Sequence, residues 1–346
     1  MSHANINLVS VAALVIILAA AQTAQEIVLP FLLAIFIAII AAAPMTWLRN
    51  KGISSVVAVS LIVLVVILFF STTTLILTTS IDSFSQMLPG YLARLRESTD
   101  QLLQWLSGHG LNISGKGIRN AFDPGAAMNL ANTILSGLAQ LLSNAFLITL
   151  TVVFMLLEAS VFSQKIELIR HDGGKTMEKI SLFVDNTKSY MGIKTVTSFI
   201  TGVLVGIGMA ILGVDFPLLW GFLAFLLNFI PTIGSIIAAV PAVLLAMVQL
   251  DASLAMAVAV FYLAVNMLVG NVLEPRMLGR GVGLSTLVVF LSLVFWGWLF
   301  GPVGMLLSVP LTMVVKFATE SNEDTRWIAT LLSASGPVTA ETDNKG

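Results

Sequence analysis

The stretch from Asn271 to Thr286 reads N-V-L-E-P-R-M-L-G-R-G-V-G-L-S-T, and a long apolar run follows it as far as Lys316. The apolar run is interrupted by Gly301-Pro302, Gly304 and Pro310. Lipid offers no hydrogen-bond partners, so backbone that is not plain helix survives at membrane depth only where it is buried in protein or lines a polar cavity. Broken helices of this kind are typical of secondary transporters, which hold substrate near the membrane midplane.

The composition identifies an integral membrane protein. Of 346 residues, 57% are hydrophobic and only 10% are charged, whereas a soluble domain carries about 25% charged residues. The net charge of −1 comes with no basic face, so we expect no nucleic-acid partner. The chain contains no cysteine, which excludes disulfides and thiolate metal sites.

The apolar segments predict an all-α, polytopic fold with about eight membrane segments, because a membrane helix needs about 20 mostly apolar residues. Two regions, 216–249 and 284–316, are too long for one straight span. Both are broken midway, at Pro231 to Gly234 and at Gly301-Pro302, so each is predicted to form two short helices or a re-entrant hairpin. The remaining spans are expected at 6–25, 27–47, 53–79, 137–158, 191–213 and 252–270.

The N-terminal apolar run could also be a signal peptide. No Lys or Arg precedes it and a second apolar segment follows at once, which favours a membrane helix.

The loop charges predict the orientation. With the N-terminus inside, the inside loops contain Arg49 and Lys51, six basic residues between Lys165 and Lys194, and later Arg276 and Arg280. The short outside loops contain only acids. Since basic residues collect on the cytoplasmic side, both termini are predicted to be cytoplasmic.

The chain is predicted to have five regions. Amphipathic helices are expected near 88–106 and 175–190, outside the membrane spans. The regions are three membrane helices (1–79), an extracytoplasmic amphipathic helical region (80–136), membrane helices with a cytoplasmic amphipathic loop (137–213), a transport core with both broken hairpins (214–316) and a cytoplasmic tail (317–346).

The two broken regions resemble each other. Gly213-Val214-Asp215-Phe216 opens the first and Gly281-Val282-Gly283-Leu284 opens the second. A Phe-Leu pair follows nine residues after each opening glycine, and after each break comes a small-residue stretch that ends in Val-Pro, at Val240-Pro241 and Val309-Pro310. On the predicted topology the two regions enter from opposite sides, which indicates an inverted repeat.

The charged and amide residues near the spans are the candidates for a transport path. A buried charge is costly in a membrane, so each one is a functional candidate. Glu274, beside Pro275, either lines the path and titrates or pairs locally with Arg276 or Arg280. The amides must hydrogen-bond to a neighbouring helix or to a polar substrate. We place Glu274, Asn271, Asn228, Asn266 and Arg276 on the path, with Glu274 and Glu158 as coupling candidates.

The glycines and prolines of the broken regions are expected to shape the backbone. No motif of a hydrolase, zinc peptidase or P-loop nucleotide site occurs, so we expect no enzyme activity, no cofactor, no metal and no ATP-driven transport. The backbone set is Pro231, Gly234, Pro275, Gly301, Pro302, Gly304 and Pro310.

These residues resemble the autoinducer-2 exporter family. The resemblance rests on the stretch from Asn271, on W-G-W-L-F-G-P-V-G-M-L-L-S-V-P to Pro310, and on Asn228-Phe229-Ile230-Pro231 with Gly234. It implies about eight membrane segments in a bacterial inner membrane, export of the small hydroxylated signal autoinducer-2, contact with membrane lipid, and a homo-oligomer with a pentamer as the implied assembly. It also implies sodium(lithium)/proton antiport as the alternative function, because some members have been assigned that activity. A non-transporting membrane scaffold acting through 80–136 is a third hypothesis.

Overall fold

The computed structural model describes residues 3–108, 133, 136–137, 143–169, 174–231, 233–278, 283–320 and 323–334, and these are almost entirely helical. Within them the one piece of β structure is an isolated bridge between Leu284 and Ser333. The helices are α1 (His3–Thr23), α2 (Gln25–Asn50), α3 (Ser55–Gly108), α6 (Ala145–Ile169), α7 (Gly174–Leu212), α8 (Pro217–Leu227), α9 (Ile233–Gln249), α10 (Ala252–Asn266), the π-helix η2 (Met267–Leu273), α11 (Glu274–Leu278), α12 (Thr286–Leu306), α13 (Ser308–Glu320), the 3₁₀ turn η3 (Glu323–Thr325) and α14 (Arg326–Leu332).

Five helical stretches in the described part of the chain are long and apolar enough to cross a membrane. They are Gln25–Asn50, Ser55–Phe84, Leu182–Leu212, Ala252–Leu278 and Thr286–Leu306. Shorter apolar helices, including α8 and α9, accompany them. The prediction of an all-α, polytopic membrane protein is therefore confirmed.

Three helices run further than the predicted spans. α3 continues unbroken from its membrane span into the amphipathic segment expected near 88–106 and ends at Gly108. α7 begins at Gly174 and includes the amphipathic segment expected near 175–190. The helix of the predicted span 252–270 continues through η2 and α11 to Leu278. An apolar run predicts the part of a helix that lies in lipid. Backbone hydrogen bonds can continue the helix beyond that part, so hydropathy alone does not predict the residue at which the helix ends.

The chain divides into two compact units. Unit 1 comprises 1–63, 147–195 and 275–346, and unit 2 comprises 64–146 and 196–274. Most of the predicted region 80–136 beyond Gly108 lies outside the described residues, as does Arg280.

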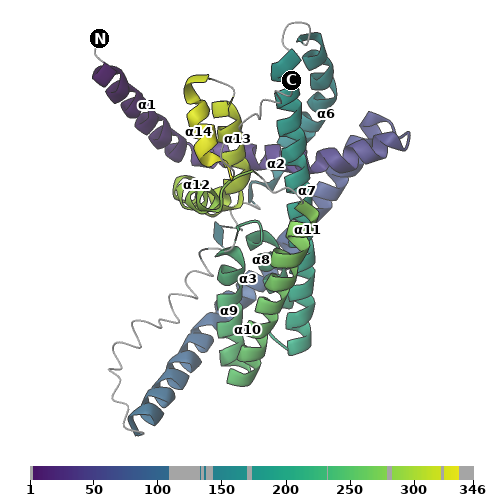
Figure 1. Cartoon of the computed structure of the whole chain (residues 1–346). Helices are drawn as coiled ribbons and strands as arrows, with labels where there is room; N and C mark the ends of the chain where they lie inside the picture. The colour runs from purple at the N-terminus through teal and green to yellow at the C-terminus, as the bar shows by residue number, and fades with distance from the viewer. Residues whose placement is uncertain are drawn as a thin grey trace, which may run out of the picture. The chain divides into compact units, whose positions relative to one another are not determined.

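Unit 2 contains a helical hairpin, α8–α9, and α10 packs beside α9 (Figure 1). The hairpin turns over Asn228 to Pro231, next to the break predicted from Pro231 to Gly234. Gly234 makes the turn possible, because a Cβ on it would overlap the carbonyl oxygen of Leu227. At the other end, α8 crosses α7 closely: a Cβ on Gly221 would lie 2.7 Å from the carbonyl oxygen of Gly202. With 11 residues, α8 is about 16 Å long, too short to cross a hydrocarbon core of about 30 Å.

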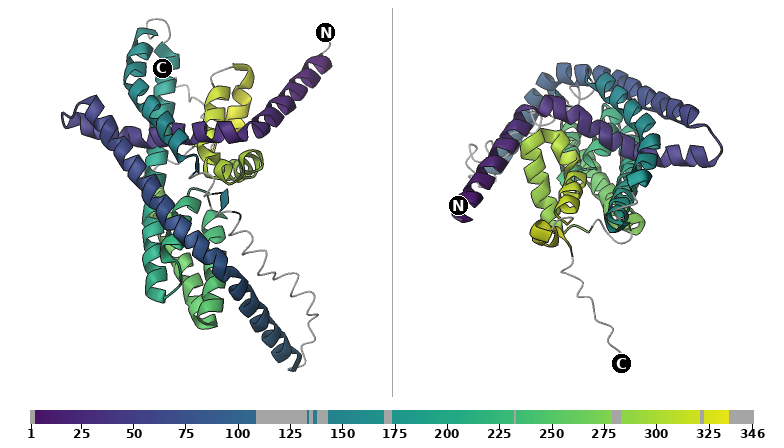
Figure 2. Two further views of the ribbon diagram at one scale, coloured as in Figure 1. Left: turned by 180° about the vertical axis from the view of Figure 1, so that it is seen from behind. Right: turned by 90° about the horizontal axis from the view of Figure 1, so that it is seen from above.

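Unit 1 contains the second hairpin, formed by α12 and α13, with α14 beside α13 (Figure 2). Within the range given for α12, Gly301 has φ 63° and ψ −151°, a non-helical conformation that glycine adopts readily, and the chain turns back there. A Cβ on Gly304 would overlap the carbonyl oxygen of Trp296. The break predicted at Gly301-Pro302 is thus present, and the straight part of α12 ends at Phe300.

Candidate transport site

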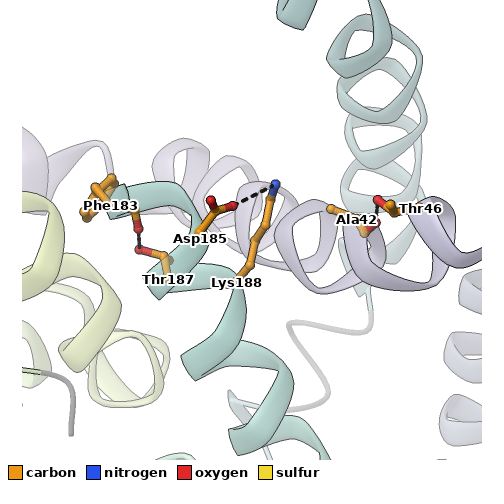
Figure 3. Close-up of polar contacts among 6 residues, drawn as sticks. All are labelled: Ala42, Thr46, Phe183, Asp185, Thr187 and Lys188. Carbon is orange, nitrogen blue, oxygen red and sulfur yellow. Dashed lines mark hydrogen bonds and ion pairs between the residues drawn. The ribbon is translucent and has the colours of Figure 1, made fainter. Parts of the chain in front are cut away.

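Most threonine hydroxyls are satisfied within their own helix and do not indicate a site. Thr46 in α2 donates to the carbonyl oxygen of Ala42 (2.8 Å), and Thr187 in α7 donates to that of Phe183 (2.8 Å; Figure 3). Such bonds to the residue four positions earlier hide a hydroxyl from lipid without a second helix. The Asp185–Lys188 pair in the same view spans 4.0 Å between exposed side chains, and pairs of this kind contribute little to stability.

Asn228 behaves differently, because its amide bonds across helices. It is 8% exposed at the C-terminal end of α8, and its Nδ2 donates to Oγ of Ser198 in α7 (3.0 Å). Thr197 and Ser198 are fully buried, and Thr201 is nearly so. The hairpin turn of unit 2 therefore meets a group of buried neutral hydrogen-bonding side chains.

An apolar cavity of about 450 Å³ lies elsewhere in unit 2. Phe69 of α3, Phe199 of α7 and Phe225 of α8 line it, with Gly202, Gly206 and Gly221 where α7 and α8 cross. Thr73 supplies the one hydroxyl among its lining side chains. A substrate rich in hydroxyls would leave its polar groups unpaired here, so we do not assign this cavity to a polar substrate.

The helix before Glu274 is irregular. From Met267 to Leu273 it is a π-helix, in which each N–H bonds to the carbonyl five residues earlier, and the N–H of Glu274 donates to the carbonyl oxygen of Val269. The next bond of this series, to the carbonyl oxygen of Gly270, cannot form from Pro275 because proline has no N–H. π-Turns inside helices occur frequently at functional sites.

Three predicted residues lie on this irregular helix. Asn266 is half-buried, Asn271 is exposed, and Glu274 is half-buried and has interactions of its own. Because the helix runs to Leu278, Glu274 lies inside a 27-residue helix, whereas the predicted span ended at 270, before Glu274. Arg276 follows as an exposed residue in unit 1.

The other predicted residues belong to unit 1. Glu158 is an exposed residue of α6 with interactions of its own. Gly301, Pro302, Gly304 and Pro310 lie in the α12–α13 hairpin, where Nε1 of Trp296 donates to Oγ1 of Thr312 across the arms (3.0 Å). The structure thus gathers Asn228, Pro231 and Gly234 at one hairpin turn, and Asn266, Asn271 and Glu274 on one helix.

Several polar groups are buried that the sequence did not predict to be functional. Lys194 is 5% exposed on α7, although its charge suggested a cytoplasmic loop. The hydroxyls of Tyr262 and Ser308 are buried without a hydrogen-bond partner among the described residues. Tyr262 lies in an apolar helix and carried no signal, but Ser308 precedes Val309-Pro310, which the sequence had singled out.

A polar cluster also escaped the sequence analysis at the entry to the α8–α9 hairpin. The hydroxyl of Tyr91 in α3 donates to Oδ2 of Asp215 (3.0 Å), and Gln249 bonds to the backbone of Gly213 and Asp215. Burial, and next the hydrogen bond to Asp215, raises the pKa of Tyr91 to about 12. The phenol therefore keeps its proton, and remains a donor, throughout the physiological pH range.

Comparison with known proteins identifies the family. Residues 11–323 match the family described as AI-2E family transporter. The chain belongs to the AI-2E transporter family. It is 42% identical to a candidate transport protein of Haemophilus influenzae, over 94% of this chain and 95% of the relative. It is 40% identical to the AI-2 transport protein TqsA of Escherichia coli, over 92% of this chain and 93% of the relative. A third relative, the candidate transport protein YhhT of Escherichia coli, is 35% identical over 95% of both chains.

Membership in the AI-2E transporter family accounts for the resemblance noted in the sequence. The chain is thus a multi-pass membrane protein of a bacterial transporter family. The matched region includes both hairpins and the irregular helix, so the elements described above are parts of a transporter.

Proposed function

We propose that this AI-2E family transporter exports autoinducer-2 across the bacterial inner membrane, by secondary or facilitated transport, with both termini in the cytoplasm. The observation that supports this most is the 40% identity to the AI-2 transport protein TqsA over 92% of the chain. The other relatives are described only as candidate transport proteins, so the substrate rests on this one comparison.

The chemistry of these neutral polar side chains fits a hydroxylated substrate. Asn228 with Ser198, and Asn266 with Asn271, offer neutral donors and acceptors near the hairpin turn and the irregular helix. In this proposal the asparagines and hydroxyls bind substrate hydroxyls, Arg276 borders the path, and Glu274 binds substrate or couples proton movement. The backbone at Pro231, Gly234, Pro275, Gly301, Pro302, Gly304 and Pro310 shapes the path, and Glu158 is the second coupling candidate.

The first experiment measures autoinducer-2 partition between cells and medium. A deletion strain is compared with one that re-expresses the chain, with and without a protonophore. Export predicts a lower intracellular signal on re-expression, and loss of that effect with the protonophore would mean that proton movement drives export. An unchanged partition on re-expression would contradict autoinducer-2 export.

Variants then test the proposed site. Glu274→Gln and Asn271→Ala, at wild-type protein levels, are expected to reduce export severalfold. Asp185→Asn, in an exposed ion pair, serves as the matched control and is expected to export normally. Sodium-dependent dequenching of a pH-sensitive dye in everted vesicles would instead support the antiport alternative.

We also propose that the protein is a homo-oligomer, with a pentamer as the expected assembly. The resemblance to the autoinducer-2 exporter family supports this proposal. Native mass spectrometry of the detergent-solubilised protein tests it, and a monomer under conditions that preserve transport after reconstitution would contradict it.

A further inference from the structure

The loop that enters the α8–α9 hairpin has a strained backbone. Phe216 has φ 59° and ψ 47°, the left-handed conformation, and among the described residues it is the one non-glycine with positive φ. A bulky aromatic residue rarely adopts this conformation, and such strain persists only where the surroundings hold it. Strained residues of this kind cluster at clamps and switches.

Three elements of unit 2 hold this loop. From α8, Nε1 of the fully buried Trp220 donates to the carbonyl oxygen of Asp215 (2.8 Å). From the last residue of α9, Oε1 of Gln249 accepts the N–H of Asp215 (2.9 Å) and Nε2 donates to the carbonyl oxygen of Gly213 (3.1 Å). One side chain thus joins the end of the hairpin to its beginning.

The third element is α3, at the end of its apolar span and beyond it. Phe84 is fully buried, and its ring contacts those of Phe216 and Trp220 edge to face, each with centroids 6.1 Å apart. Two turns further along, Tyr91 is 7% exposed and donates its hydroxyl proton to Oδ2 of Asp215 (3.0 Å). The bond between Tyr91 and Asp215 is the one side-chain hydrogen bond described between α3 and the hairpin.

We propose that Tyr91 is a latch: the extension of α3 beyond the membrane holds the base of the α8–α9 hairpin through Asp215, and transport requires this bond to open. In this role Tyr91 is a positioning residue, since it acts on the hairpin and not on the substrate. When the Tyr91–Asp215 bond opens, the strained backbone at Phe216 can relax. This release of strain favours a change in the conformation of the loop. The proposal rests on the transport function proposed above, though not on which substrate is carried.

The first test measures hydrogen exchange of the full-length protein and does not depend on any substrate. Tyr91→Phe is expected to speed exchange of the amides at 213–220 about five- to thirtyfold, the factor that corresponds to the loss of one buried hydrogen bond. Asp215→Asn keeps an acceptor for the phenol and is expected to exchange like the wild type. Asp215→Ala is expected to match Tyr91→Phe. Unchanged exchange in both Tyr91→Phe and Asp215→Ala would overturn the latch.

The second test uses the absence of natural cysteines. Cysteines replacing Tyr91 and Asp215 are bridged by a bis-methanethiosulfonate reagent whose links are cleaved by reductant. Bridging is expected to stop autoinducer-2 export and reduction to restore it, while Tyr91→Cys alone, treated in the same way, is expected to keep exporting. Full export by the bridged protein would overturn the latch.

The two tests separate the failure of each proposal. If the wild type does not export autoinducer-2, the proposed function fails, and the exchange measurement still decides whether Tyr91 holds the hairpin base. If the wild type exports and the bridged protein exports equally, the latch alone fails.

Discussion

In the α8–α9 hairpin and in the α12–α13 hairpin, a glycine with positive φ precedes the first arm, at Gly213 (φ 75°) and Gly283 (φ 70°). In each, a second glycine packs against the first arm where the chain turns: Gly234 against Ile230, and Gly304 against Phe300. Each of these three pairs is separated by 70 residues in the sequence. In the sequence pattern Gly-Val-x-x, Gly213 corresponds to Gly281, 68 residues later. In the structure Gly213 corresponds to Gly283, so the structural alignment of the two hairpins is shifted by two residues from the sequence alignment.

The bases of the two hairpins are fastened in the same way by different side chains. Gln249, at the end of α9, donates to the carbonyl oxygen of Gly213 (3.1 Å), and Lys316, near the end of α13, donates to that of Gly283 (2.8 Å). The two bases differ in the second hydrogen bond that each of them receives. Tyr91 fastens the first, whereas Ala334 donates its N–H to the carbonyl of Gly283 at the second (3.3 Å).

The interiors of the hairpins also differ. Eight residues after the packed glycine, the first hairpin has Ala242 and the second has Thr312, which accepts the hydrogen bond of Trp296. Four residues after it, the first has Ala238 and the second has Ser308. All four positions are buried. The turn geometry therefore requires glycine at the same positions in both hairpins, whereas the side chains between the two arms can be apolar in one hairpin and polar in the other.

The largest expected effect comes from filling the glycine contacts that both hairpins share. Gly234→Ala and Gly304→Ala are each expected to lower stability by about 3 kcal/mol or more, because the new Cβ overlaps a backbone carbonyl that cannot move away easily. Thermal unfolding in detergent measures the change. Gly192→Ala, at a helix position with nothing near its Cβ, is the control and should raise stability by about 0.5–1 kcal/mol. Equal unfolding temperatures for all three variants would contradict the claim that both hairpins require glycine at this contact.

The next effect tests the fastening of the bases. Lys316→Met and Gln249→Met are each expected to cost about 1.5–3 kcal/mol, because the first removes one bond from a charged donor and the second removes two neutral bonds. Chemical unfolding in mixed micelles measures both, with Lys51→Met, at an exposed helix end, as the control. Equal stability of Lys316→Met and Lys51→Met would show that the bond from Lys316 to Gly283 does not stabilise the base of the second hairpin.

A smaller effect tests the polar interior of the second hairpin. Thr312→Val is expected to cost about 1–2 kcal/mol, because it leaves Nε1 of Trp296 without an acceptor, while Thr312→Ser keeps the acceptor and should behave like the wild type. Thr187→Val is the matched control. Its hydroxyl bonds only within its own helix, so the change should stay within about 0.5 kcal/mol. A loss in Thr187→Val as large as in Thr312→Val would argue against a special role for the cross-arm bond.

The smallest effect comes from making the second hairpin resemble the first at Ser308. The Ser308 hydroxyl is buried without a partner among the described residues, so Ser308→Ala removes an unpaired polar group and should leave stability unchanged or raise it slightly. The same thermal unfolding assay measures it. A clear loss of stability would show that the hydroxyl has a partner in the folded protein. Normal stability combined with reduced export would assign the hydroxyl to the transport path.

Much of this fold was predictable because lipid restricts what a chain can do. Apolar runs predicted the membrane helices, and Pro231 and Gly301-Pro302 predicted the two breaks, since proline removes a backbone donor and glycine adopts non-helical backbone angles. Proline alone does not decide a break, because Pro30, Pro44 and Pro241 lie inside helices. The candidate site was predicted less completely. Asn228 and Glu274 were named from their rarity in apolar surroundings, but the amide partner Ser198 and the π-helix before Glu274 have no local signal.

The sequence by itself determined the membrane class, the all-helical fold, the two broken segments and the family, because hydropathy and turn residues act over short distances along the chain. The tertiary structure alone decided the 70-residue register of the hairpins, the contact of Gln249 with Gly213 and the bond from Tyr91 to Asp215. These depend on residues far apart in sequence, 36 positions for the first bond and 124 for the second, which only packing brings together. Local pattern specifies which helices form, whereas the side chains that fasten them are set by where the folded chain places them.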